Sequence, residues 1–337
     1  MFPKLRFKEF DENWKEVTLK NCITSIDSGW SPQCESYPAN SSEWGVLKTT
    51  SVDWSGFNSS FNKKLPLELT PRKEIEVKPL DILVTRAGPT ERVGVVSVVP
   101  HSVRSKLMIS DKLIRLKSNE ENNPLFLGIS LSSVKCQNQL QSKTSGLAKS
   151  QTNISQKILG EVLLKLPSKE EQTKIASFLS AVDEKISQLT KKHELLSQYK
   201  QGMMQKLFSQ QLRFKADDGS EFREWEEKEL KDIAEINPKS KKLPESFIYI
   251  DLESVEKGQL LLQKNIELQD APSRAQRLLA KGDVLFQMVR PYQQNNYYFN
   301  LSGEYVASTG YAQIRTKLDS KFLYYALHEK TFLDEVM

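Results

Sequence analysis

The sequence predicts an α+β protein in which two copies of one domain are separated by a long coiled-coil helix. Three observations lead to this prediction. Short motifs recur in the same order along the chain, each copy mixes strand-like and helix-like segments, and a heptad pattern runs between the copies. We expect a first domain over residues 1–168, a spacer helix over residues 169–210 and a second domain over residues 211–337.

The duplication rests on five matches that keep their order. The first is extended by Trp14 and Trp225, each of which is followed by a leucine five residues later. The period, about 200 residues, is far longer than a solenoid repeat, so the pattern indicates a duplicated domain. The matched segments are 6–8 with 213–215, 47–52 with 250–255, 81–84 with 283–286, 113–115 with 313–315, and 126–127 with 322–323.

Each copy is predicted to be α+β. Short segments rich in valine and isoleucine, such as residues 81–85 and 93–99, are punctuated by glycine and proline, which is typical of strands. Helical patterns occur near residues 124–134 and 321–329. The recurring Asp81 and Asp283 are interpreted as residues of a turn that leads into a strand.

The central helix is the clearest prediction of secondary structure. Two series of positions seven residues apart run through residues 169–208, and eight of their ten members are apolar, which is typical of a coiled coil. The other two, His193 and Lys200, either pack their stems at the edge of the seam or fix its register. Ser168 and Glu171 fit a capping box at the start of the helix. The apolar members are Ile175, Leu179, Val182, Ile186, Leu189, Leu196, Met203 and Leu207.

Such a stripe needs a partner helix in water. The repeat places the partner after the second domain, but matching residue 126 with 322 aligns Met337 with position 141, so we expect the second copy to lack about 70 residues and the second helix. Three explanations stay open: a natural truncation, one piece of a split subunit, or a half-type subunit whose helix pairs with another copy.

Composition excludes several classes of protein. No apolar stretch is long enough to span a membrane and the N-terminus lacks a signal peptide, so we expect a cytoplasmic protein. The three cysteines have no CxxC spacing and the three histidines are scattered, so we expect neither a metal site nor a disulfide framework. The net charge of +5 is compatible with DNA binding without indicating it strongly.

Motifs for catalysis are absent. Residues 123–126 and 237–239 fail the Asn/Asp-Pro-Pro-Tyr/Phe pattern of adenine methyltransferases. Residues 88–94 lack the lysine of a phosphate-binding loop, and no nuclease-type carboxylate set follows a strand. We therefore expect a protein without catalytic residues and without a cofactor.

Three short segments carry a resemblance to a known family. Residues 166–175, Leu-Pro-Ser-Lys-Glu-Glu-Gln-Thr-Lys-Ile, stand where the first domain meets the helix. Residues 29–32 look like a Gly-x-(Ser/Thr)-Pro turn, and residues 236–239 look like its alternative, Ile-Asn-Pro-Lys. With the duplicated domains, these segments make the chain resemble the specificity subunits of type I restriction-modification systems over essentially its whole length.

The resemblance implies a non-catalytic DNA-binding subunit. Two target recognition domains would each read one half of a split sequence in double-stranded DNA, and two antiparallel helices would space them. Methyltransferase (M) subunits would dock on the helices and domains, and restriction (R) subunits would complete the nuclease. A second copy, or a separate C-terminal fragment, is the expected partner of the spacer helix; no membrane is involved.

Two segments have the side chains that match base edges and phosphates. Lys48, Thr49, Thr50, Arg86 and Arg92 are weaker candidates, because a basic residue beside a strand is usually solvated. The alternative is that both segments are merely polar surface loops. In the first domain the predicted DNA-binding residues are Lys143, Thr144, Ser145, Lys149, Gln151 and Asn153, and in the second they are Arg290, Tyr292, Gln293, Gln294, Asn295 and Asn296.

Two other classes of function stay open. A fused nuclease or methyltransferase fragment would need catalytic motifs that the sequence lacks. A coiled-coil scaffold would explain the helix but not the duplicated domain with amide-rich loops. A half-type subunit that dimerises would read a palindromic site instead of a bipartite one.

Overall fold

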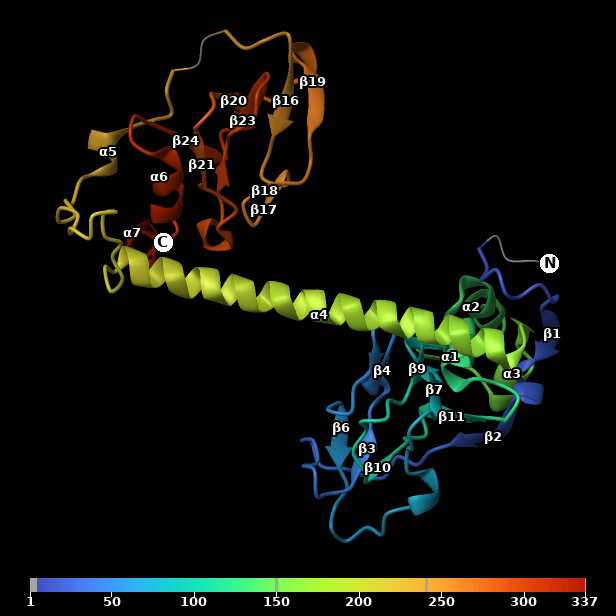
Figure 1. Cartoon of the computed structure of the whole chain (residues 1–337). Helices are drawn as coiled ribbons and strands as arrows, with labels where there is room; N and C mark the ends of the chain where they lie inside the picture. Colours follow the sequence, from blue (N-terminus) through green and yellow to red (C-terminus); the bar gives the residue numbers. More distant parts are fainter. Residues whose placement is uncertain (1–4, 149–150, 240–241, 337) are drawn as a thin grey trace. The chain divides into compact units, whose positions relative to one another are not determined.

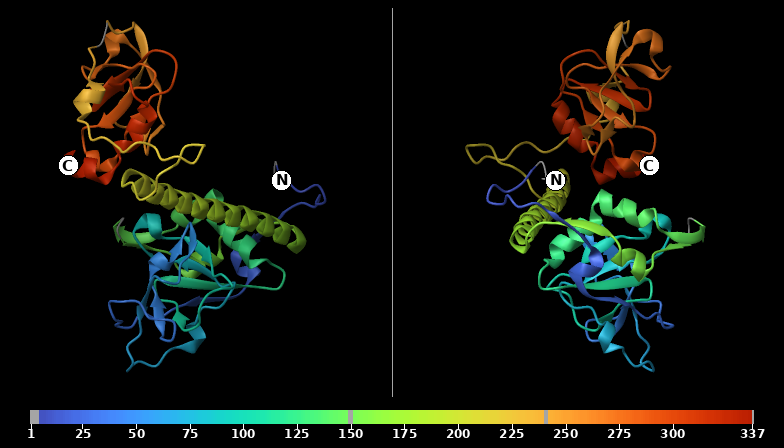
Figure 2. Two further views of the ribbon diagram at one scale, coloured as in Figure 1. Left: turned by 60° about the vertical axis from the view of Figure 1, so that its left-hand side comes forward. Right: turned by 90° about the vertical axis from the view of Figure 1, so that its right-hand side faces the viewer.

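The computed structural model describes residues 5–148, 151–239 and 242–336, and it divides the chain into two compact units, residues 1–188 and 189–337. Helix α4, Lys169–Phe208, is the longest element (Figure 1) and is continuous in two further views (Figure 2). The predicted long helix between two α+β domains is thus confirmed. No helix in the described part of the chain is long and apolar enough to cross a membrane.

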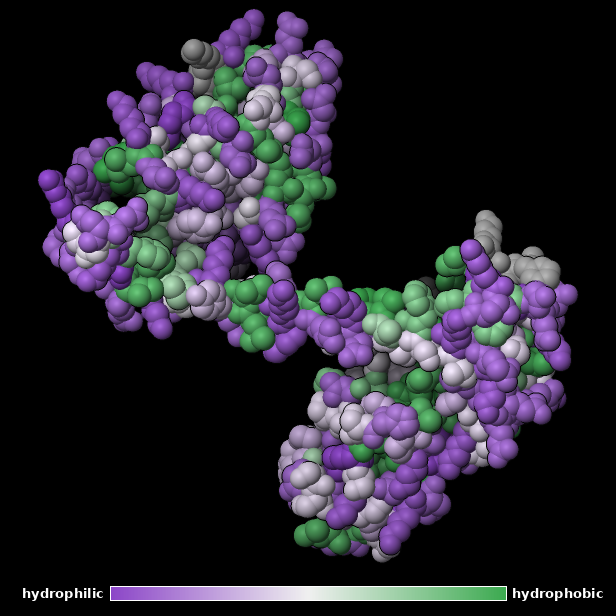
Figure 3. Space-filling view, in the orientation of Figure 1, coloured by the Kyte–Doolittle hydropathy of each residue, from purple (hydrophilic) through white to green (hydrophobic). Residues whose placement is uncertain are grey.

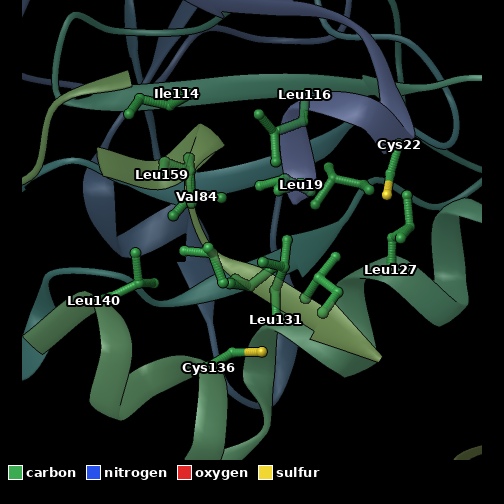
Figure 4. Close-up of a cluster of buried hydrophobic side chains, with 14 of the residues drawn as sticks. Leu19, Cys22, Val84, Ile114, Leu116, Leu127, Leu131, Cys136, Leu140 and Leu159 are labelled. Carbon is green, nitrogen blue, oxygen red and sulfur yellow. The ribbon is translucent and has the colours of Figure 1, made fainter. Parts of the chain in front are cut away.

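The first unit is built on a four-stranded antiparallel sheet in the order β2-β11-β7-β9. Helix α1, Pro124–Ser132, packs against strands β7, β9 and β11, and α2, Val134–Gln141, follows it. Figure 4 shows side chains of the sheet, such as Val84 and Leu116, gathered with Leu131 of α1 and Leu140 of α2. The strands are β2 Ile23–Ser28, β11 Leu113–Ser118, β7 Ile82–Thr85 and β9 Val96–Val98.

Smaller sheets complete the first unit. One has the order β10-β3-β6, with β10 parallel to β3, and covers a second apolar core. Another has the order β12-β13-β8, β1 pairs with β14, and β4 and β5 form a hairpin. Their bounds are β1 Lys15–Thr18, β3 Gly45–Leu47, β4 Val52–Asp53, β5 Gly56–Phe57, β6 Asn62–Lys64, β8 Ala87–Gly88, β10 Leu107–Met108, β12 Ser145–Ala148, β13 Gln151–Asn153 and β14 Leu163–Leu166, with the short helix α3 at Gln156–Gly160.

The second unit repeats this plan. Its first sheet has the order β15-β24-β21-β22, with α6 packed on β21 and β22; its second has the order β19-β16-β23-β20, with β23 parallel to β16; and β17 and β18 form a hairpin. The bounds are β15 Ala234–Ile236, β16 Ser246–Ile250, β17 Val255–Glu256, β18 Gln259–Leu260, β19 Lys264–Glu267, β20 Ala275–Leu278, β21 Val284–Gln287, β22 Tyr297–Tyr298, β23 Tyr305–Ser308, β24 Tyr311–Thr316, α5 Leu230–Ile233, α6 Ser320–Ala326 and α7 Lys330–Val336.

The repeated residues explain the repeated fold. Asp81 accepts a hydrogen bond from the backbone N–H of Lys78 at 2.8 Å, and Asp283 accepts one from Ala280 at 2.7 Å, so each aspartate closes the turn before its strand, as predicted. The strands β7 and β21 that follow are fully buried. The duplication predicted from sequence is therefore a duplication of strand order and of turn chemistry.

Several predicted boundaries were wrong for local reasons. The strand expected over residues 93–99 is only Val96–Val98, because residues 93 and 94 form a turn in which Gly94 has a φ of 86°. The helix expected over residues 124–134 divides at Ser133, whose hydroxyl accepts from the Cys136 N–H and caps α2. The helix expected over residues 321–329 is α6, which ends at Ala326, and a separate helix, α7, begins at Lys330.

Candidate nucleic-acid interface

The first predicted DNA-binding segment is a β-hairpin and not the loop expected from sequence. Strands β12 and β13 pair with Ser145 opposite Asn153, and β13 pairs with β8. Lys143 and Asn153 are exposed, whereas the Thr144 hydroxyl donates to the Gln141 carbonyl at 3.0 Å. The backbone of Gln151 lies in β13. Lys149 lies outside the described residues.

Strand β8 connects this hairpin to the segment between β7 and β9. The Thr152 hydroxyl donates to the Gly88 carbonyl at 3.2 Å, and the Ile154 N–H donates to the Arg86 carbonyl at 3.0 Å. Both bonds tie the hairpin to residues 86–88, directly after the buried strand β7. The structure therefore brings the weaker candidate Arg86 beside the predicted segment.

Arg92 serves as an internal anchor. Its guanidinium donates to the Asp53 carboxylate at 2.5 Å and to the Val52 carbonyl at 2.8 Å. The hydrogen bond from Arg92 lowers the pKa of Asp53 below its ordinary value, which favours the ionised carboxylate that Arg92 binds. Because its donors are engaged by β4, Arg92 positions the β4–β5 hairpin.

The predicted segment of the second unit lies between β21 and β22, so its counterpart in the first unit is the segment between β7 and β9 and not the β12–β13 hairpin. Arg290 and Gln294 have backbone φ angles of 56° and 52°, in the left-handed region, which turns the chain sharply on both sides of a 3-10 turn, Pro291–Gln293. Four predicted residues are exposed on this loop: Arg290, Tyr292, Gln293 and Gln294.

The two asparagines of the same segment hold the loop in place. Asn296 is only 1% exposed, and its side-chain oxygen accepts from the Gln287 N–H at 2.8 Å. The Asn295 side-chain oxygen accepts from the Lys257 N–H at 3.1 Å. In this conformation neither oxygen is directed to a ligand, so both residues shape the loop that presents their neighbours.

Gln287 is a supporting residue that sequence reasoning missed. Its amide nitrogen donates to the Val289 carbonyl at 2.7 Å and to the Gln293 side chain at 3.1 Å, and its oxygen accepts from the Asn295 N–H at 3.0 Å. The available signal was its place at the end of a buried strand, where the repeat matches it with Thr85. A side-chain amide that is buried at such a position must form hydrogen bonds, so a glutamine there indicates a residue that holds its neighbours by hydrogen bonds.

His328 lies against this network. Its Nδ1 donates to the Tyr324 carbonyl at 2.7 Å, which leaves Nε2 as an acceptor 3.4 Å from the side-chain nitrogen of Asn296. Burial lowers the pKa of His328, although the Tyr324 carbonyl acts in the opposite direction. The neutral ring therefore helps to hold Asn296. Among the described residues, no group of three or more His, Cys, Asp or Glu could hold a metal ion.

The apolar stripe of α4 has the pattern expected of an unpartnered seam. Four of its members, Val182, Ile186, Leu189 and Leu196, are between 40% and 56% exposed. Figure 3 shows apolar patches along the exposed part of the helix. The members near the helix ends, Ile175, Leu179, Met203 and Leu207, are partly buried. The Lys200 ammonium lies 5.3 Å from the ring centroid of Tyr325, and both Lys200 and His193 are exposed.

The start of α4 is fixed to the first unit by a buried carboxylate. The Glu171 backbone N–H donates to the Ser168 hydroxyl at 3.4 Å, but its side chain does not close the expected capping box. It accepts instead from Arg6 at 2.6 and 2.8 Å and from the Trp14 indole N–H at 3.3 Å. The Trp14 ring also meets Phe126 edge-on, with centroids 6.1 Å apart. Sequence reasoning found Trp14 in the repeat without finding this role.

The second unit repeats the aromatic pair beside an open groove. Trp225 and Phe322, the counterparts of Trp14 and Phe126, meet with centroids 5.8 Å apart. Arg213, the counterpart of Arg6, bonds at 2.8 Å to Glu224, which is exposed. The groove beside them has a volume of about 650 Å³ and is mostly apolar. Its lining includes Met203, Leu207, Phe214, Trp225, Phe322 and Tyr325.

Comparison with known proteins assigns the family. Residues 12–197, more than half of the chain, match the family model of the type I restriction modification DNA specificity domain. The chain belongs to this family.

Relatives of this specificity-domain chain are named as specificity subunits. The type I restriction enzyme EcoEI specificity subunit of Escherichia coli is 40% identical over 171 residues, which is 50% of this chain and 29% of that protein. The MjaVIII specificity subunit of Methanocaldococcus jannaschii is 30% identical over 169 residues, 49% of this chain and 37% of that protein. The chain thus spans about a third of the length of these two relatives.

A solved structure shares the fold of the specificity-domain chain. The S subunit of a type I restriction-modification system from M. genitalium has a TM-score of 0.61 at 17% identity, and the likeness covers 99% of this chain and 82% of that one. At this identity the likeness concerns the fold.

Proposed function

We propose that this chain is a non-catalytic specificity subunit that reads a bipartite sequence in double-stranded DNA and directs methyltransferase and restriction subunits to it. One observation carries the proposal: a polar, hydrogen-bonded segment directly follows each of the equivalent buried strands β7 and β21, and in the first unit the β12–β13 hairpin pairs with that segment through β8. A chain with two similar DNA-binding units is suited to a target sequence with two halves.

Exposed residues of the loop between β21 and β22 and of the β12–β13 hairpin region supply the reading chemistry. Arg290 can donate two parallel hydrogen bonds to guanine, and Gln293 and Gln294 can pair with adenine. In the first unit Lys143 suits a phosphate and Asn153 a base edge. The remaining predicted residues, Thr144, Ser145, Lys149 and Gln151, belong to the same segment, and Asn295 and Asn296 act by fixing the loop.

We also propose that a second helix covers the stripe of α4, supplied by a second copy of the chain or by a separate fragment. Two features support this: the exposed apolar residues from Val182 to Leu196, and the groove beside Trp225, whose counterpart Trp14 receives the start of a helix in the first unit. Burial of apolar side chains would stabilise the pair by roughly 1–2 kcal/mol for each half-exposed residue.

The deciding experiment is co-expression with methyltransferase subunits and mapping of methylated adenines by single-molecule sequencing. A split asymmetric motif would mean that both units read DNA in one chain. A palindrome would mean that two chains pair and use one unit each. A folded complex without methylation would refute recognition, and absence of any complex would favour a scaffold.

A paired variant tests the helix surface. Ile186→Ser with Leu189→Ser removes two exposed apolar side chains, so association through α4 should weaken by at least 10-fold in sedimentation or co-purification. Glu184→Ser with Lys191→Ser is the control, because it alters the opposite face and leaves the net charge unchanged. Equal association of both variants would refute the helix proposal.

A further inference from the structure

Each unit carries a β-hairpin at an equivalent place that the reading segments above do not include. Hairpin β4–β5 follows Ser51 and hairpin β17–β18 follows Ser254, the matched serines of the repeat. Both serines are fully buried, and their hydroxyls donate at 2.7 Å, to the Lys48 carbonyl and to the Asp251 carboxylate. The two hairpins therefore leave the fold from the same kind of fixed point.

Each hairpin is bound to the segment that follows the equivalent buried strand of its unit. In the first unit, Arg92 joins residues 90–92 to Asp53 and Val52 of β4, and the Ser97 hydroxyl donates to the Asp53 carbonyl at 2.7 Å. In the second unit, the Lys257 N–H at the hairpin tip donates to Asn295 of the exposed loop. The hairpin and its neighbouring segment thus form one surface.

The two tips differ in chemistry. Asp53 pairs with Gly56, so Trp54 and Ser55 form the first tip; Glu256 pairs with Gln259, so Lys257 and Gly258 form the second. Lys257 and Gly258 have φ angles of 49° and 77°, the pattern of a type I′ turn. Trp54 is 51% exposed, and the Lys257 side chain is exposed as well.

The exposed half of the Trp54 side chain is available to a ligand, and apolar side chains that contact DNA recognise thymine methyl groups or enter base steps. An exposed lysine at the equivalent tip suits a phosphate oxygen. The indole of Trp54 and the ammonium of Lys257 are thus two groups suited to contact DNA, each at the tip of an equivalent hairpin.

We infer that the β4–β5 and β17–β18 hairpins are second DNA-contacting elements, with Trp54 contributing to the sequence preference of the first unit and Lys257 binding the phosphate backbone beside the second. This inference rests on the proposed function. It assigns Trp54 a specificity role and Lys257 a role in affinity for any sequence.

The test uses the full chain in complex with methyltransferase subunits, and DNA that contains the mapped target or a scrambled sequence. Trp54→Ala should weaken binding to the target roughly 10-fold and leave scrambled DNA unaffected, while Trp54→Phe should retain most of the preference. Lys257→Asn should weaken both and reduce the slope of log affinity against log salt by about 1. Asparagine is chosen because it tolerates a left-handed backbone.

The control is Tyr37→Ala. Tyr37 is also 51% exposed, but its ring lies 5.8 Å from the Lys64 ammonium, and Lys64 belongs to β6. If Trp54→Ala matches the control while the wild-type complex prefers its target, the hairpin inference fails and the proposed function stands. If the wild-type complex binds the target no better than scrambled DNA, both fail. Equal thermal unfolding of the variants excludes a folding defect as the cause.

Discussion

Truncating Asn296 should destabilise the second unit and not merely weaken DNA binding. In Asn296→Ala, the buried N–H of Gln287 loses the oxygen it binds at 2.8 Å, at a position where the wild-type side chain is 1% exposed. A buried donor left without an acceptor costs about 1–3 kcal/mol. For a unit of about 150 residues, each kcal/mol lowers Tm by roughly 2–4 °C.

The assay is hydrogen exchange with peptide-level mass spectrometry, combined with thermal unfolding. Exchange should accelerate in peptides that contain residues 284–298, because the Gln287 amide becomes accessible as the loop loosens. Peptides of the first unit should exchange at unchanged rates, which makes them an internal reference within the same sample.

Tyr292→Ala is the matched variant, because Tyr292 is exposed on the same loop. It should weaken DNA binding without changing the unfolding free energy by more than about 0.5 kcal/mol. Wild-type stability and exchange in Asn296→Ala would refute the reasoning, since they would mean that the oxygen of Asn296 does not hold the loop.

Three further predictions concern titration, reactivity and the turn aspartate. Because burial lowers the pKa of His328, the stability that its neutral ring contributes should be complete above about pH 6.5 and be lost as pH falls through the lowered pKa of the folded state. Urea unfolding at pH 7 and pH 5.5 should therefore show that the unfolding free energy falls less between these two pH values in His328→Gln than in the wild type. Burial raises the pKa of Cys22 to about 11, so a disulfide reagent at pH 8 should label the partly exposed Cys34 first and label both alike in urea. Asp283→Ala should lower the unfolding free energy, measured by chemical denaturation, by about 3 kcal/mol. This value is at the low end for breaking a buried ion pair, because Arg315 keeps access to water.

The long helix and the repeated domain plan could be predicted from sequence because they depend on local patterns, several of which occur in both copies of the domain. The heptads predict α4 as the longest helix, and the structure has it over Lys169–Phe208. The matched Asp81 and Asp283 predict turns before buried strands, since an aspartate that accepts from the residue three before it needs only nearby backbone.

The sites could be predicted only in part, because their decisive contacts are distant in sequence. Glu171 satisfies a local capping pattern, yet Arg6, 165 residues away, takes its carboxylate. Asn296 has the composition of a reading residue, but Gln287 and His328 enclose it. Composition identifies which segments are polar; burial decides which polar side chains face outward, and burial depends on the whole fold.

The division between residues that fix the loops and residues at their exposed tips has a consequence for how the proposed DNA preference could change. Gln287, Asn295 and Asn296 hold the second loop through bonds to one another and to backbone, and Arg92 holds the first hairpin through backbone and Asp53. The exposed tips stand outside the apolar cores of both units. Substitutions at exposed positions usually change stability by less than about 0.5 kcal/mol, so the tips can vary while the anchors stay fixed. The same reasoning predicts that exchanging tips preserves folding, whereas exchanging one anchor alone does not.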